Sequence, residues 1–146
     1  MTASSTLARH AFTHVLDEAV TLLAVDDDPI LREFASVYLA SPSATIETAC
    51  SAEEGLARLA AARFDIALID LEMPGMGGLE MIRRIRDDAS LCRLPVIVVT
   101  GREDIASIDM AYQAGATSFV TKPVNWRLLA YQVRYVLRAQ RALDAA

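Results

Sequence analysis

Residues 21–34 read TLLAVDDDPILREF, and they join a short apolar run directly to three consecutive carboxylates. An apolar run of this length, residues 22–25, is typical of a buried strand. Pro29 follows the acids and suits the first turn of a helix, because its missing N–H would be unpaired there. The stretch therefore predicts a strand, an acidic turn and a helix. Since adjacent like charges repel, the turn is either solvated or the edge of a site that binds a cation.

The alternation of short apolar runs and helical patterns continues along the chain. It predicts strands at 21–26, 44–49, 65–70, 95–100 and 117–121, with helices at 29–40, 52–62, 78–88, 103–114 and from 125 onward. A capping box, Ser51 with Glu54, marks the start of one helix, and Gly115 is placed to end another. Alternating strands and helices form a parallel sheet covered on both faces. We therefore expect an α/β fold with a doubly wound, five-stranded parallel sheet.

Composition limits the class of protein. The chain has 146 residues, of which 53% are hydrophobic, enough for one compact domain with a substantial core. A net charge of −5 argues against nucleic acid as a ligand bound directly. No apolar run approaches the roughly 18 residues of a membrane span, and no signal peptide is evident, which predicts a cytoplasmic protein without membrane contact. Cys50 and Cys92 lack metal-type spacing and are expected to be free and half-buried.

Polar side chains stand at the ends of four predicted strands. Asp26 and Asp27 end the first strand, Asp70 the third, Thr100 the fourth and Lys122 the fifth. In doubly wound sheets, ligands bind beyond the carboxyl ends of the strands, so these groups are expected to converge. Lys122 is the only lysine among 14 basic residues. A compact ammonium with three donors binds differently from a planar guanidinium, so we infer that the site requires a lysine.

This set of groups suggests a particular chemistry. Mg²⁺ is typically held by a few carboxylates, waters and phosphate oxygens, and a cation relieves the repulsion between the acids. Lys122 and Thr100 can then hold the remaining oxygens of a phosphoryl group. The residues therefore predict a site that carries phosphate on a carboxylate, which is a form of nucleophilic catalysis.

Four motifs together resemble the receiver domain of two-component response regulators, the CheY-like family. They are VDDDP (25–29), DIALIDLEMPGMGGLEMIRRIR (65–86), PVIVVTG (95–101) and GATSFVTKP (115–123). The resemblance covers about residues 21–137, so residues 1–20 form an N-terminal leader and 138–146 a C-terminal helical extension. It implies a flavodoxin-like fold with strand order 2-1-3-4-5 and five helices. It also implies a cis peptide between Lys122 and Pro123, which proline permits at low cost.

The resemblance also assigns the phosphoacceptor and the metal ligands. Asp70 is expected to accept the phosphoryl group from a sensor histidine kinase or a phosphotransfer protein. Asp27 would bind Mg²⁺ directly, Asp26 directly or through water, and Glu72 through its backbone carbonyl. The glycines of the segment MPGMGG would let the backbone approach this site closely.

The switch residues follow from the same resemblance. Thr100 and Lys122 would contact the phosphoryl oxygens, and Phe119 would turn inward when Thr100 moves. The protein would then be a phosphoprotein of phosphorelay signal transduction that controls a partner or a downstream effector domain. It would not be a metabolic enzyme, because it catalyses only its own phosphorylation and dephosphorylation.

One alternative comes from another class, the haloacid-dehalogenase-like phosphatases. They place an Asp-x-Asp motif after a first strand, which Asp26 and Asp28 fit. They also need an acidic pair after the lysine, but Asp144 is the only acid after Lys122. In this reading Asp70 would have no role, and Asp28 is more simply explained as a helix cap.

The last helix is longer than a receiver needs. From Asn125 the chain has no Gly or Pro, and six of its side chains follow coiled-coil spacing: Trp126, Leu129, Val133, Val136, Gln140 and Leu143. The first four are expected to pack on the sheet, whereas Gln140 and Leu143 lie beyond it. The segment from Lys122 is also similar to the last helix of receivers that precede diguanylate cyclase (GGDEF) domains, which would suggest an output through cyclic-di-GMP.

Three fates for this extension stay open. Four arginines share its opposite face: Arg127, Arg134, Arg138 and Arg141. The helix is a linker to an output domain, a surface for an acidic partner, or a dimer face. For the last, we expect phosphorylation to favour a homodimer through the extension or the 4-5-5 face, which is the surface of the fourth helix, fifth strand and fifth helix. Residues 138–146 would then be ordered only when paired.

Overall fold

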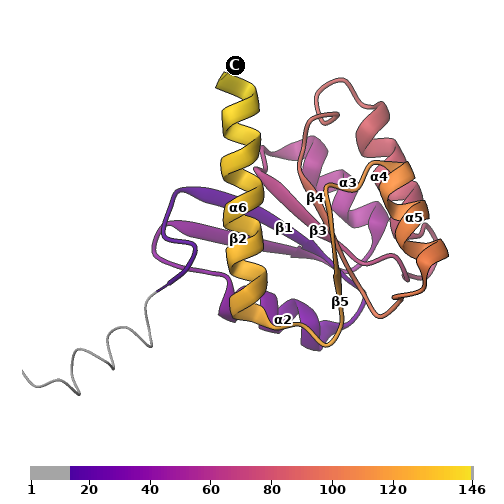
Figure 1. Ribbon diagram of the computed structural model, residues 1–146, viewed down its shortest axis with the longest axis horizontal. Coiled ribbons are helices and arrows are strands. Elements are labelled where there is room, and N and C mark those ends of the chain that lie inside the picture. The colour runs from indigo at the N-terminus through magenta and orange to yellow at the C-terminus, as the bar shows by residue number, and fades with distance from the viewer. Residues whose placement is uncertain (1–13, 146) are drawn as a thin grey trace, which may run out of the picture.

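The computed structural model describes residues 14–145, which form one five-stranded parallel sheet between two layers of helices (Figure 1). The strands are β1 (Val20–Val25), β2 (Ala44–Ala49), β3 (Ile66–Ile69), β4 (Val96–Thr100) and β5 (Ser118–Thr121). The helices are α2 (Pro29–Tyr38), α3 (Ala52–Ala61), α4 (Gly78–Asp87), α5 (Ile105–Ala114) and α6 (Trp126–Ala145). The strand order is β2-β1-β3-β4-β5, and every pair is parallel. The doubly wound fold expected from the sequence is confirmed.

The two faces of the sheet bury separate hydrophobic clusters. In β1, Leu22 and Ala24 face the cluster beneath α2 and α6, whereas Leu23 and Val25 face the cluster beneath α3, α4 and α5. This alternation follows from the two-residue period of a strand. Because both faces are covered, the central strands β1, β3 and β4 are almost wholly buried, which explains their continuous apolar sequences.

Local signals in the sequence set the helix ends. The Asp28 carboxylate accepts a hydrogen bond from the Ile30 N–H at the start of α2, and Ser51 Oγ accepts one from the Glu54 N–H at the start of α3. Gly115 ends α5 in the left-handed region, with φ of 115°. The cis peptide between Lys122 and Pro123 is present as expected. All five strands and five helices fall within about two residues of the predicted boundaries.

The described part of the N-terminal leader has an irregular backbone. Residues 14–19 have no helical structure, and residues 1–13 lie outside the described part of the chain. Leu16 is nevertheless only 2% exposed, because it joins the hydrophobic cluster beneath α2 and α6. Its side chain is therefore buried by tertiary packing, which a helical period does not describe.

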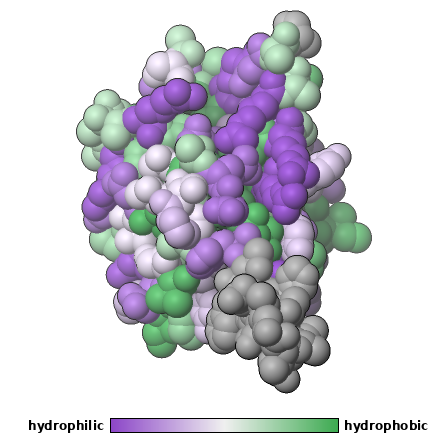
Figure 2. Space-filling view, turned by 90° about the vertical axis from the view of Figure 1, so that its left-hand side faces the viewer, coloured by the Kyte–Doolittle hydropathy of each residue, from purple (hydrophilic) through white to green (hydrophobic). Residues whose placement is uncertain are grey.

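Helix α6 confirms part of the expected pattern. Leu129, Val133 and Val136 are buried against the sheet, whereas Leu143 is 64% exposed. Figure 2 shows hydrophilic side chains gathered near the C-terminal end of the chain. The single chain already continues α6 to Ala145, which differs from the expectation that residues 138–146 are ordered only when paired. Contacts within the chain supply the missing partner, as described below.

Two remaining expectations concern the cysteines and membranes. Cys50 and Cys92 are free, as expected, but both are exposed rather than half-buried. Cys50 lies between the end of β2 and the N-cap of α3, and Cys92 lies in the turn between α4 and β4. Among the helices of residues 14–145, none has the length and apolar character needed to cross a membrane.

Candidate functional site

Four strand ends bring the expected polar residues together at the carboxyl edge of the sheet. Asp26 follows β1, Asp70 follows β3, Thr100 is the last residue of β4, and Lys122 follows β5. Asp26, Asp70 and Thr100 are at most 5% exposed. Buried charges need partners. The two buried carboxylates at this edge therefore indicate a functional site.

Lys122 joins the two buried carboxylates. Its Nζ lies 2.9 Å from Asp26 Oδ2 and 3.0 Å from Asp70 Oδ2. The second oxygen of each carboxylate accepts a backbone N–H: Asp26 Oδ1 from Asp28 at 2.9 Å, and Asp70 Oδ1 from Glu72 at 3.1 Å. Both carboxylates are therefore held in fixed orientations by one charged and one neutral donor.

Burial and charge shift the proton affinities within this cluster. Burial raises the pKa of Asp26, and the nearby Asp70 carboxylate adds to this, although the Asp28 N–H and the Lys122 ammonium oppose it. Burial alone would lower the pKa of Lys122, but its hydrogen bonds to Asp26 and Asp70 outweigh that and raise it. Lys122 is therefore firmly positive, and it holds the centre of an acidic cluster.

The carboxylates fit a divalent cation. Asp26, Asp27 and Asp70 each offer an oxygen, and these oxygens lie within 4.8 Å of one another. Asp27 is exposed, whereas the other two are buried, so solvent reaches the cluster at Asp27. An oxygen-only set of this kind matches the preference of Mg²⁺. The backbone carbonyl of Glu72 stays a predicted fourth protein ligand.

Asp28 does not join this cluster. Its side chain caps α2, as the hydrogen bond to the Ile30 N–H shows. The phosphatase alternative needs Asp28 beside Asp26 at the reacting centre, and the structure places Asp70 there instead. The Asp-x-Asp reading of the acidic run is therefore not supported.

Close backbone packing beneath the site depends on glycine. A Cβ added to Gly78 would lie 2.1 Å from the carbonyl oxygen of Asp70, far too close for any side chain. The Gly78 N–H donates to the Leu71 carbonyl at 3.1 Å, which closes the loop between β3 and α4. Gly75 takes a left-handed φ of 76° within the same loop. The glycines of the MPGMGG segment thus allow α4 to start directly against Asp70.

The two predicted switch residues lie on the β4–β5 side of the site. The Thr100 hydroxyl is buried and accepts the Arg102 N–H at a long 3.4 Å. Phe119, on β5, is half-buried and packs against the cluster beneath α3, α4 and α5. These positions allow both side chains to change their contacts, but their roles in switching stay predictions.

Arg102 forms two ion pairs that were not expected from the sequence. Arg102 Nη1 lies 3.3 Å from Glu72 Oε1, and its Nε lies 3.2 Å from Asp104 Oδ1. These two hydrogen-bonded acids raise the pKa of Arg102. Only their positions in the sequence could have indicated this contact. Glu72 stands two residues after Asp70, and Arg102 stands two residues after Thr100.

Comparison with known proteins agrees with this geometry. The profile of the response regulator receiver domain family matches residues 22–134. The transcriptional regulatory protein AfsQ1 of Streptomyces coelicolor is 36% identical over 118 residues, which cover 81% of this chain and 51% of that protein. The heme response regulator HssR of Staphylococcus epidermidis is 34% identical over 119 residues, covering 82% and 52%. This chain thus spans about half the length of these relatives.

A solved structure supports the fold independently. The CheY-like receiver domain protein of Methanospirillum hungatei superimposes with a TM-score of 0.80 at 29% identity, covering 86% of this chain and 98% of that one. The likeness of the last helix to receivers that precede diguanylate cyclases gains no support, because the relatives above are transcriptional and heme response regulators.

Proposed function

Because this chain belongs to the response regulator receiver family, we propose that it accepts a phosphoryl group on Asp70 with the help of Mg²⁺ and switches conformation as a result. The single observation that carries the proposal is the position of Asp70. Its carboxylate lies at the end of a central strand, within 4.8 Å of the Asp26 and Asp27 oxygens, and is bonded to Lys122.

The carboxylate cluster gives each residue a distinct task. Asp26, Asp27 and one oxygen of Asp70 would hold Mg²⁺, with the Glu72 carbonyl completing the protein ligands. Bound Mg²⁺ would neutralise the charge that gathers on the phosphoryl oxygens during transfer. The Glu72 N–H fixes Asp70 Oδ1, so the direction of the attacking carboxylate is set before the donor arrives.

Lys122 and Thr100 would hold the transferred group. The Lys122 ammonium already reaches Asp70 Oδ2, so it is placed to bind a phosphoryl oxygen on that side. The Thr100 hydroxyl lies buried at the end of the adjacent strand and has only a weak acceptor contact to lose. A new bond from Thr100 to phosphate would bias β4, β5 and Phe119, which is the two-state element that switching requires.

The phosphodonor would dock on the exposed face of α2. Ile30, Phe34 and Val37 are 63%, 44% and 60% exposed and lie on one side of the helix that starts beside Asp26. Tyr38 and Trp126 extend this surface with a stacked pair whose ring centroids are 6.1 Å apart. Exposed apolar surfaces of this kind mark interaction sites, and we assign this one to a sensor histidine kinase or a phosphotransfer protein.

The output of the switch is proposed from the relatives. AfsQ1 is named a transcriptional regulatory protein, which favours an output on DNA and runs against the expectation that no nucleic acid is bound. We propose that any DNA contact is made by an output domain, since the net charge of −5 gives these residues no attraction for phosphate backbones. An output through cyclic-di-GMP is not proposed. The cytoplasmic location stays a prediction.

Phosphorylation in vitro tests this function. Incubation with acetyl phosphate and Mg²⁺ is expected to add one phosphoryl group, measured by intact mass, and removal of Mg²⁺ with a chelator should prevent it. The Asp70→Asn variant should remain unmodified, whereas Asp65→Asn, at the opposite end of β3, should be modified normally. Undiminished phosphorylation of Asp70→Asn would refute the proposal.

A further inference from the structure

Two segments outside the family match meet at the amino-terminal edge of the sheet. The match covers residues 22–134, which leaves residues 14–21 before it and the last turns of α6 after it. Leu16 and Leu137 are 2% and 3% exposed and belong to the same hydrophobic cluster. Arg141 Nη1 forms an ion pair with Glu18 Oε2. The two additions to the family core therefore contact each other, at the edge opposite Asp70.

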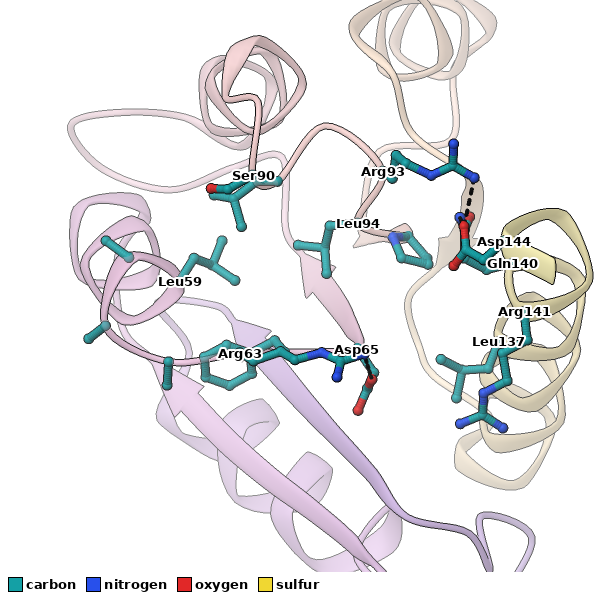
Figure 3. Close-up of a pocket in the computed structure, with 16 residues that line it drawn as sticks. Leu59, Arg63, Asp65, Ser90, Arg93, Leu94, Leu137, Gln140, Arg141 and Asp144 are labelled. Carbon is teal, nitrogen blue, oxygen red and sulfur yellow. Dashed lines mark hydrogen bonds and ion pairs between the residues drawn. The ribbon is translucent and has the colours of Figure 1, made fainter. Parts of the chain in front are cut away.

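A second contact holds the end of α6 from another direction. Arg93, in the loop between α4 and β4, forms an ion pair of 2.6 Å with Asp144 Oδ1. Gln140 Nε2 also donates to Asp144 Oδ1, at 3.1 Å, which orients that carboxylate. In Figure 3, Arg93 and Asp144 point toward each other across the mouth of a cavity of about 600 Å³. The last two turns of α6 thus line one side of the cavity and are held by ion pairs to Arg93 and to Glu18.

These contacts explain why the extension is helical without a second chain. The terminal turns of a helix gain little from propensity alone, and an exposed ion pair by itself contributes little. Here the ion pair at Glu18 stands two residues from a fully buried leucine, so the segment that carries it is already anchored. Ordering Glu18 therefore costs less entropy than ordering a free side chain.

We propose that residues 14–19 act as a strap which, together with Arg93, clamps the last turns of α6 to the amino-terminal edge of the sheet. The strap fixes the direction in which α6 leaves the domain. This device does not depend on phosphorylation of Asp70, and it replaces pairing with a second copy as the reason that the extension is ordered.

Hydrogen–deuterium exchange of the full chain tests the clamp. In Glu18→Arg, the backbone amides of residues 138–145 should exchange about fivefold faster than in the wild type, because an attractive pair becomes a repulsive one. Amides of β3 should keep their protection, which shows that the domain is still folded. Asp17→Arg is the matched control: it makes the same charge change at the exposed neighbouring residue, and it should leave α6 unchanged.

Swapping the charges of Glu18 and Arg141 is the most specific test of the clamp. The double variant Glu18→Arg with Arg141→Glu restores an ion pair of opposite polarity, and its exchange in residues 138–145 should return to within about twofold of the wild type. Asp144→Ala should accelerate the same amides, because it removes the acceptor for Arg93. If Glu18→Arg left their exchange unchanged, or if the double variant were no slower than the single one, the strap would be refuted.

Discussion

Lys122 Nζ lies 3.0 Å from Asp70 Oδ2, across 52 positions of sequence. The same ammonium lies 2.9 Å from Asp26 Oδ2, so a single lysine connects the ends of β1, β3 and β5. This arrangement explains why the chain has a lysine at this position, although all 13 other Lys or Arg positions are arginine. A compact ammonium donates in three directions, which a planar guanidinium cannot do in the same space.

Removal of this ammonium should destabilise the protein when Mg²⁺ is absent. In Lys122→Met, the buried carboxylates of Asp26 and Asp70 would face each other without a counter-charge, at an expected cost of about 3 kcal/mol. Denaturant unfolding measures this free energy, and added Mg²⁺ should recover part of the loss in the variant. A stability equal to the wild type in chelator would show that Lys122 is not the counter-charge of the cluster.

The same residue gives a pH dependence. The folded pKa of Lys122 is raised above its ordinary value of 10.5, so its stabilising contribution is fully present below that value. It is lost as the pH rises through the higher folded pKa. Wild-type stability should therefore fall more steeply than that of Lys122→Met above about pH 10.5. Parallel curves for the two proteins in this range would contradict the assignment.

Mg²⁺ binding should depend on one particular residue of the acidic run. Asp27→Ala is expected to weaken Mg²⁺ affinity by about tenfold or more, because an octahedral ion with few protein ligands has little redundancy. Asp28→Ala should leave the affinity nearly unchanged, since that side chain caps α2, and should instead cost about 1 kcal/mol of stability. Calorimetric titration separates the two. The reverse order would mean that the ligands are shifted by one residue.

Switching should require the hydroxyl of Thr100. In Thr100→Ala, phosphorylation should still occur, but it should no longer draw Phe119 inward or change the surface of α5, β5 and α6. The reason is that the hydroxyl supplies the differential contact between the two states. Amide spectra with and without beryllofluoride measure the change, with Thr121→Ala on the neighbouring strand as a control. A full shift across that surface in Thr100→Ala would remove Thr100 from the switch.

Phosphorylation is also expected to favour a homodimer through β5 and α6. A groove of about 420 Å³ lies between them, lined by Tyr131, Tyr135 and Leu143 among others. Tyr135 is 75% exposed, so Tyr135→Glu should abolish dimers without unfolding the domain. As a control, Val37→Glu on α2 should leave dimers intact. Sedimentation that shows monomers in the wild type, with and without beryllofluoride, would exclude the dimer.

Much of this fold was accessible from local patterns. The apolar runs that become β1, β3 and β4 are continuous because both of their faces are buried, and Asp28, Ser51 and Gly115 each act at a helix end through their own backbone neighbours. The convergence of the strand-end groups followed from the parallel topology alone. The helix ends depend on residues only a few positions away, and the convergence of the strand-end residues is a general property of doubly wound sheets.

The rest depended on contacts between distant segments. The ion pair between Glu18 and Arg141 joins positions more than a hundred residues apart, and Leu16 is buried in a cluster that includes residues of α6. No periodicity in the sequence encodes these contacts. The Arg102–Glu72 pair likewise joins two loops 30 positions apart. The exposure of both cysteines depends on how turns leave the core. Such features require the folded chain, because a charge pattern alone does not say which acid a given arginine meets.

Locating the modification within the chain tests directly whether Asp70 carries the phosphoryl group. The protein phosphorylated with acetyl phosphate and Mg²⁺ is reduced with borohydride, which converts an aspartyl phosphate to homoserine, and the peptides are then sequenced by mass spectrometry. We expect homoserine at position 70 and unmodified aspartate at positions 26, 27 and 28. Homoserine at any of those three positions, with Asp70 intact, would contradict it.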